Sequence, residues 1–138
     1  MTVKNFLTIG GIVLVVVGLG GMVGILGPTA DSSVFGSLWW FDNGENWAHL
    51  ILGVAALIVV FAVPSLGAPV TLLVGVLGLL VGLWGFALMG GVPNFYGANL
   101  ENPADNILHL AVGAWALLSW MKGRKSMSLM SPMGTSGM

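Results

Sequence analysis

The chain has 138 residues, of which 57% are hydrophobic and only 7% are charged, and its formal net charge is −1. A water-soluble surface needs about a quarter or more of its residues charged, so this composition excludes a soluble globular domain and indicates lipid as the solvent. The small net charge argues against a nucleic-acid partner, and the absence of cysteine excludes disulfides and thiolate metal sites.

Four hydrophobic runs predict transmembrane helices. Three of them lack Asp, Glu, Lys and Arg: residues 6–27, 46–63 and 68–91. Each is close to the ~20 residues that a helix needs to cross a bilayer. The fourth run, 107–121, is shorter, but a helix that begins at Pro103 reaches roughly 28 Å. We therefore expect an all-α integral membrane four-helix bundle over residues 1–121, followed by a basic and then Met/Ser/Gly-rich flexible cytoplasmic tail over residues 122–138.

The charged residues predict how the helices are oriented. The basic residues flank the outer ends of the first and last helices: Lys4, Lys122, Arg124 and Lys125. The acidic residues fall in the two longer connections: Asp31, Asp42, Glu45, Glu101 and Asp105. By the positive-inside rule both termini are cytoplasmic, in an inner or plasma membrane, and Trp39, Trp40 and Trp47 form an aromatic belt at the outer boundary. The short link 64–69 predicts that the second and third helices are antiparallel neighbours.

An internal repeat is the most specific signal in the sequence. One pattern occurs twice, 60 residues apart: Glu45-Asn46-x-x-His49-Leu50-x-x-Gly53 and Asp105-Asn106-x-x-His109-Leu110-x-x-Gly113. Glycines in the first run recur 64 residues later in the third: 11, 18 and 21 match 75, 82 and 85. This pattern predicts two parallel copies of one hairpin, residues 6–63 and 68–121, related by a pseudo-two-fold axis along the membrane normal. The glycine stripes predict close helix packing.

The even-numbered helices begin with capping patterns. Asn102 is the expected N-cap of the last helix, with Pro103 at its first position and Asp105 at its third, and Asp42 with Glu45 repeats the arrangement. These carboxylates satisfy free amide groups and oppose the helix dipole, so we interpret them as structural rather than as general acids.

His49 and His109 lie roughly 10 Å along their helices from these caps, inside the apolar layer. Small residues share their helix faces, so we expect both imidazoles to point into the protein, beside Asn46 and Asn106. The favoured interpretation is that each imidazole bonds to an asparagine or a backbone carbonyl of the other hairpin and holds the two copies in register. The alternative is axial ligation of a haem or a chlorophyll-type pigment. A metal or proton pathway is weaker, since no inward carboxylate or thiolate accompanies the pair.

At these residues the chain resembles an uncharacterised, domain-of-unknown-function family of small bacterial and archaeal four-helix membrane proteins. Its motif, Asn-x-x-His/Asp-Asn-x-x-His-Leu-x-x-Gly, is found once per hairpin, and the resemblance covers roughly residues 6–121. The second copy matches it at Asn102, Asp105, Asn106, His109, Leu110 and Gly113. Many relatives carry a second histidine where this chain has Glu45, and its loss lowers the prospect of a metal site. The resemblance implies the fold and no established activity.

The remaining sequence predicts no catalytic residue, because it offers no nucleophile with a base and no phosphate-binding loop. We therefore expect a non-enzymatic membrane scaffold or accessory subunit, homo-oligomeric or bound to other membrane subunits, without a cofactor. The alternative is a haem- or pigment-binding protein that uses His49 and His109. A channel or transporter ranks last, since the pattern shows no polar track below the histidines. Met127, Met130 and Met133 recur every third residue, as in thioether sites for cuprous ion, within a segment that is first of all a flexible tail.

Overall fold

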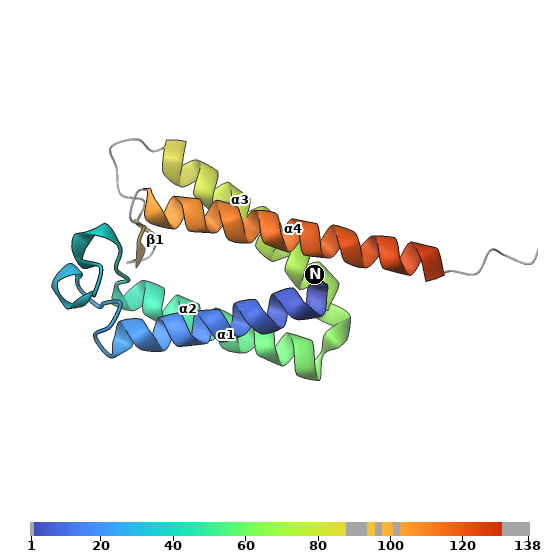
Figure 1. Ribbon diagram of the computed structural model, residues 1–138, viewed down its shortest axis with the longest axis horizontal. Coiled ribbons are helices and arrows are strands. Elements are labelled where there is room, and N and C mark those ends of the chain that lie inside the picture. The colour runs from blue at the N-terminus through green and yellow to red at the C-terminus, as the bar shows by residue number, and fades with distance from the viewer. Residues whose placement is uncertain (1, 88–93, 96–97, 101–102, 131–138) are drawn as a thin grey trace, which may run out of the picture.

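The computed structural model describes residues 2–87, 94–95, 98–100 and 103–130. They form four helices: α1 (Val3–Met22), α2 (Asn43–Ala62), α3 (Gly67–Ala87) and α4 (Ala104–Met130) (Figure 1). Shorter elements connect them: the 3-10 turns η1 (Ala30–Ser32), η2 (Gly36–Leu38) and η3 (Pro64–Leu66), and the antiparallel two-residue strands β1 (Asn94–Phe95) and β2 (Ala98–Asn99). The expected all-helical class is confirmed. Three segments are long and apolar enough to cross a membrane, namely Val3–Met22, Asn43–Ala62 and Pro64–Ala87.

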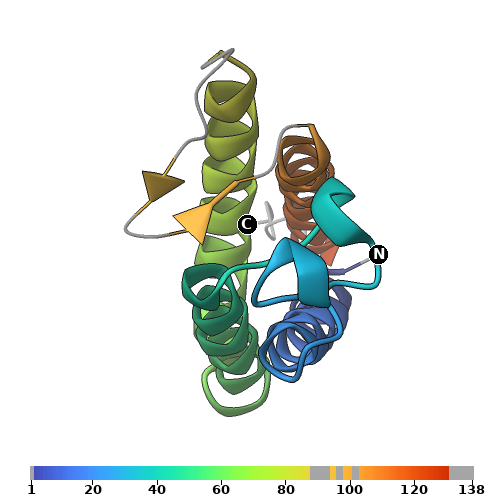
Figure 2. The same cartoon turned by 90° about the vertical axis from the view of Figure 1, so that its left-hand side faces the viewer.

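The helices pack as two hairpins. Helix α1 lies along α2, and α3 lies along α4 (Figures 1 and 2). Between the hairpins the contacts come mainly from α1, which touches both α3 and α4. The short η3 link reverses the chain without packing α2 along α3, so the expectation that these two helices are close neighbours is wrong. The reason is that the close-packing faces of α2 and α3 are already occupied within their own hairpins, by α1 and α4 respectively.

Glycines allow the close approach inside each hairpin, as predicted. A Cβ atom at Gly18 of α1 would lie 2.7 Å from the backbone oxygen of Asn46 in α2. A Cβ atom at Gly82 of α3 would lie 2.8 Å from the backbone oxygen of Asn106 in α4. Because real Cβ atoms do not approach that closely, both hairpins depend on a missing side chain at the same relative position.

Two helix ends differ from the sequence prediction. Helix α1 ends at Met22, before the hydrophobic run does, because Gly24 adopts a φ of 85° and the next two amides bond to the Gly20 oxygen at 2.9 and 3.1 Å. Helix α4 continues past the expected end at Met121 to Met130. Lysine, arginine and methionine are good helix formers, so the first part of the predicted flexible tail extends the helix instead.

The distribution of burial is the reverse of that in a soluble protein. The largest fully buried side chains are mostly polar: Leu7, Asn46, Asn106, Thr71, Asp105 and Ser119. Large apolar side chains on the outside of the helices are well exposed, for example Val16 at 62%, Ile51 at 61% and Leu80 at 58%. Such an exterior suits a lipid environment, in which apolar side chains lose nothing by facing outward.

A small apolar core joins the hairpins at the end near the N-terminus. It consists of the buried side chains Phe6, Leu7, Val60 and Ala116. Phe6 of α1 meets Trp115 of α4 edge to face, with ring centroids 4.8 Å apart. Aromatic pairs in this geometry contribute about 0.5–1.5 kcal/mol beyond the area they bury, so this contact helps to fix α1 against α4.

Charges of opposite sign lie at opposite ends of the helices. The 23–42 connection and the start of α4 occupy one end, and the N-terminus and the later part of α4 extend toward the other (Figure 1). Asp42, Glu45 and Asp105 belong to the first end, whereas Lys4 lies at the start of α1. The fold thus preserves the charge separation on which the predicted orientation depends.

Candidate functional site: a buried polar layer

The cap of α2 begins a layer of buried polar side chains. The amide of Glu45 donates to the Asp42 Oδ1 atom at 2.9 Å, and the amide of Asp42 donates to the Glu45 Oε2 atom at 3.0 Å. This reciprocal capping box confirms the structural interpretation of both carboxylates. In the second hairpin Asp105 lies in the first turn of α4 and is 2% exposed, whereas the predicted cap Asn102 lies outside the described residues.

The two asparagines occupy equivalent sites, one in each hairpin. Asn46 and Asn106 are both 0% exposed. A Cβ atom at Gly21 would overlap the side-chain oxygen of Asn46, and one at Gly85 would overlap that of Asn106. Each amide therefore fills a notch in the facing helix of its own hairpin.

Asn46 also donates from Nδ2 to the backbone oxygen of Phe41 at 3.2 Å, which ties the start of α2 to the preceding connection. These contacts lie within a hairpin, whereas the sequence interpretation placed the clasps between hairpins. The difference has a simple cause. A buried amide needs a glycine opposite it on a neighbouring helix. The facing helix of the same hairpin supplies that glycine, Gly21 for Asn46 and Gly85 for Asn106.

His109 bonds to its own helix. Its half-buried ring places Nδ1 2.7 Å from the backbone oxygen of Asp105, one turn earlier in α4. A carbonyl oxygen only accepts, so Nδ1 carries a proton and donates; in the neutral form of the ring, Nε2 is then the nitrogen with the lone pair. The expected bond to the other hairpin is replaced by this local one, because the carbonyl one turn back lies within reach and costs little side-chain ordering.

His49 is placed differently from its counterpart. Its ring packs edge to face against Phe41, with centroids 4.8 Å apart. Its Nδ1 atom is buried and has no hydrogen-bond partner within the described part of the chain. The ionisable groups of the other hairpin that lie close enough to influence His49 are His109 and Asp105. The two imidazoles thus lie within electrostatic range of each other, on the inner side of their helices.

The connection between α1 and α2 covers this layer and joins the hairpins. The Nε1 atom of Trp39 donates to the Asp105 Oδ1 atom at 3.1 Å, across 66 residues of sequence. The Trp39 ring also contacts Phe41 at 5.1 Å between centroids, and the Ser33 hydroxyl donates to the Trp39 backbone oxygen at 2.7 Å. The sequence analysis treated Trp39 only as part of an aromatic belt. No local signal distinguishes Trp39 from the adjacent Trp40, so the sequence does not indicate the bond to Asp105.

Two buried hydroxyls form a further polar element that the sequence analysis missed. Thr71 of α3 is 0% exposed and Ser119 of α4 is 1% exposed. Neither hydroxyl oxygen has a hydrogen-bond partner among the residues that the structure describes. The statement that nothing polar lies below the histidines is therefore wrong. The available signal was that each is the only hydroxyl residue in its hydrophobic run.

The chemistry open to this layer is ligation or hydrogen bonding by the histidines. Within the described ranges no group of three or more His, Asp or Glu side chains is placed to hold a metal ion. His109 does have the arrangement that axial histidines use, with one ring nitrogen bonded to a carbonyl and the other available. His49 lacks that anchoring bond among the described residues, so the two are not equivalent as ligands. The side chains of Met127, Met130 and Met133 lie outside the described ones.

Comparison with known proteins adds no assignment: no protein-family model, no curated protein and no solved structure matches the chain. The resemblance based on the repeated Asn-x-x-His-Leu-x-x-Gly pattern stays a prediction.

Proposed function

We propose that this chain is a non-enzymatic integral membrane scaffold or accessory subunit, built as a four-helix bundle from two copies of one hairpin. One observation carries the proposal. Asn46 and Asn106 are both fully buried, and each fills a notch at a glycine of the facing helix, Gly21 or Gly85. The asparagines are 60 residues apart and the glycines 64 residues apart, as two copies with slightly different connections require.

The membrane location is supported by the arrangement of polar and apolar side chains. Three segments are long and apolar enough to span a bilayer, and the apolar side chains of α4 extend the same outer surface. In the proposal α4 is the fourth span, with its polar first turn at the outer boundary and Lys122 at the inner one. The positive-inside rule then places both termini in the cytoplasm.

The scaffold role is supported by the way the buried polar groups are used. The Asp42 and Glu45 carboxylates cap α2, the Asn46 amide holds α2 to the preceding connection, and Trp39 ties that connection to α4. These bonds fix helices relative to one another. The outer apolar surface stays available for lipid and for further subunits, either copies of this chain or other membrane proteins.

Site-specific photo-crosslinking in intact membranes tests this role. A benzophenone side chain is placed at Ile58 of α2 or at Ile12 of α1, which are 53% and 51% exposed. The matched control is the same group at Leu52 of α2, which is 58% exposed and lies about a third of a turn around the helix from Ile58, so that crosslinking can be compared between helix faces. We expect a discrete product of higher mass at one or more of these positions and a dependence on helix face. Monomer alone at every position would contradict the proposal.

A second candidate function, binding of a haem or chlorophyll-type pigment, is favoured by one observation, the Nδ1 bond of His109 to the Asp105 carbonyl. If such a group binds, His109 would ligate it through Nε2, and the group would supply redox or light-absorbing chemistry. The visible absorption spectrum of the purified protein decides between the candidates. A Soret or chlorophyll band that disappears in both His49→Ala and His109→Ala would replace the scaffold proposal. A colourless protein would eliminate the pigment candidate.

A further inference from the structure

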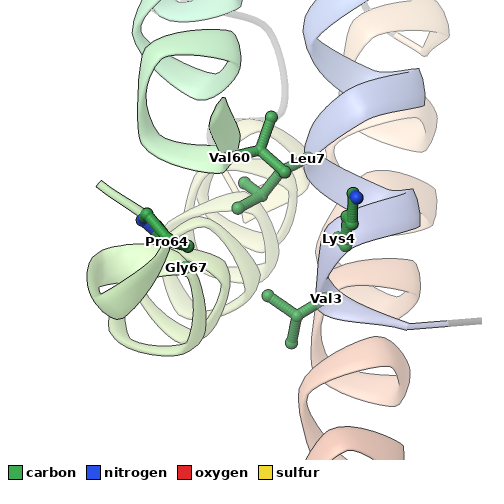
Figure 3. Close-up of a pocket in the computed structure, with 6 residues that line it drawn as sticks. All are labelled: Val3, Lys4, Leu7, Val60, Pro64 and Gly67. Atoms are coloured by element: carbon green, nitrogen blue, oxygen red, sulfur yellow. The ribbon is translucent and has the colours of Figure 1, made fainter. Parts of the chain in front are cut away.

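A small pocket opens at the end of the helices opposite the buried polar layer. It lies between the start of α1, the end of α2 and the η3 link to α3 (Figure 3). Five of its six lining residues are apolar and the sixth is Lys4: Val3, Lys4, Leu7, Val60, Pro64 and Gly67. Leu7 and Val60 belong to the apolar core that joins the hairpins, so the pocket floor is part of the packed interior.

The pocket lies where the positive charge of the protein gathers. The Val3 side chain lies close to Gly67 at the start of α3 and to Gly123 of α4. A Cβ atom added at Gly67 would lie 3.2 Å from the Val3 Cγ1 atom, and one added at Gly123 would lie 3.4 Å from the Val3 Cγ2 atom. Gly123 is flanked in α4 by basic residues, and all four Lys and Arg residues of the chain lie either at the pocket or along this segment: Lys4, Lys122, Arg124 and Lys125. The Arg124 guanidinium lies over the Trp120 ring, 4.9 Å from its centroid, in a cation–π contact, and tryptophan is enriched at membrane boundaries.

Apolar walls with a single cation at the rim fit an amphiphile with a negative headgroup. We propose that this pocket binds an anionic phospholipid of the cytoplasmic leaflet, with its phosphate at the Lys4 ammonium and the adjoining methylene groups against Val60 and Gly67. The inference rests on the proposed membrane location, which places the first turn of α1 at the headgroup level. An inorganic phosphate ion would gain nothing from the apolar walls, whereas a lipid gains both contacts.

Lipid retention by the purified full-length protein tests the site. The protein is reconstituted into vesicles of phosphatidylcholine with one fifth phosphatidylglycerol and re-extracted, and the retained lipid is counted by native mass spectrometry. We expect phosphatidylglycerol to be enriched, and Lys4→Gln to lower that enrichment about five-fold, as one basic side chain near a membrane surface contributes. The matched control Lys125→Gln removes the same charge away from the pocket lining and should lower the enrichment less than Lys4→Gln does. An equal effect of the two variants, or no enrichment in the wild type, would overturn the site.

A second variant tests the apolar part. In Gly67→Ala the added methyl group enters the pocket beside Val3, and α3 begins there with ordinary helical geometry, so the fold is kept. Retention should fall while the circular dichroism spectrum stays unchanged, and unchanged retention would refute the pocket as the site. Millimolar inorganic phosphate should not displace the lipid; displacement would identify a simple anion site instead. Alkaline extraction of membranes distinguishes failure of this inference from failure of the membrane proposal. A protein that stays in the membrane but does not retain phosphatidylglycerol would contradict the lipid site alone, whereas a protein that is extracted would contradict the membrane location.

Discussion

Replacement of Gly18 by alanine probes the helix contact on which each hairpin depends. The new Cβ atom would lie 2.7 Å from the Asn46 backbone oxygen and 2.9 Å from the Leu50 backbone nitrogen. Both neighbours are backbone atoms, so α1 and α2 must separate. Gly10 lies in the same helix with nothing within 4 Å of its added Cβ, which makes Gly10→Ala the matched control. The gain in helix propensity, about 0.8–1.0 kcal/mol, is common to both variants and cancels in the comparison.

The magnitude follows from the cost of overpacking, about 1–3 kcal/mol. We therefore expect Gly18→Ala to be less stable than Gly10→Ala by about that amount. Reversible unfolding in mixed detergent micelles, followed by circular dichroism, measures the difference. Gly82→Ala should behave like Gly18→Ala, because its Cβ atom would lie 2.8 Å from the Asn106 oxygen. Equal stabilities of the Gly10 and Gly18 variants would refute the close-packing argument.

Three further predictions follow from the same structure. Gly21→Ala should destabilise the protein by about 1–3 kcal/mol, because the new methyl group overlaps the Asn46 side chain. The loss should be much smaller in an Asn46→Ala background, and additive effects of the two substitutions in this double-mutant cycle would contradict the notch. Trp39→Phe removes the donor to Asp105, so we expect a loss of about 1 kcal/mol and faster amide exchange in residues 23–42; unchanged protection would show that the bond does not hold the connection. Leu80→Lys places a charge on the exposed face of α3, and a membrane-insertion assay should register a cost of about 2.5–3.5 kcal/mol, whereas full insertion would place that face away from lipid.

The features that the sequence predicted correctly depend on local chemistry or on strict periodicity. Runs of apolar residues predicted the helices, and the Asp42 and Glu45 side chains form the reciprocal cap that their spacing indicates. Glycines at Gly18 and Gly82 permit the backbone approach that their repeat predicted. In each case the signal lies within a few residues or recurs at a fixed interval, so one sequence is enough to read it.

The features that were missed depend on which distant segments meet. Trp39 and Asp105 are 66 residues apart, and nothing in either local sequence pairs them. The contacts between the hairpins join α1 to α3 and α4 and do not pack α2 along α3, because the glycine faces of α2 and α3 are used within their own hairpins. His109 bonds to the backbone carbonyl of Asp105 in its own helix instead of to a partner in the other hairpin. The spacing of polar residues in the sequence does not show which of these two bonds forms.

Native mass spectrometry of the protein extracted from its own membranes tests the central proposal most directly. The scaffold or accessory-subunit role predicts a defined assembly, either several copies of the 14.3 kDa chain or this chain with another membrane subunit. The assembly should persist in a mild detergent, together with bound lipid. Recovery of a lone, colourless monomer under conditions that preserve other membrane complexes would contradict both the scaffold proposal and the pigment alternative.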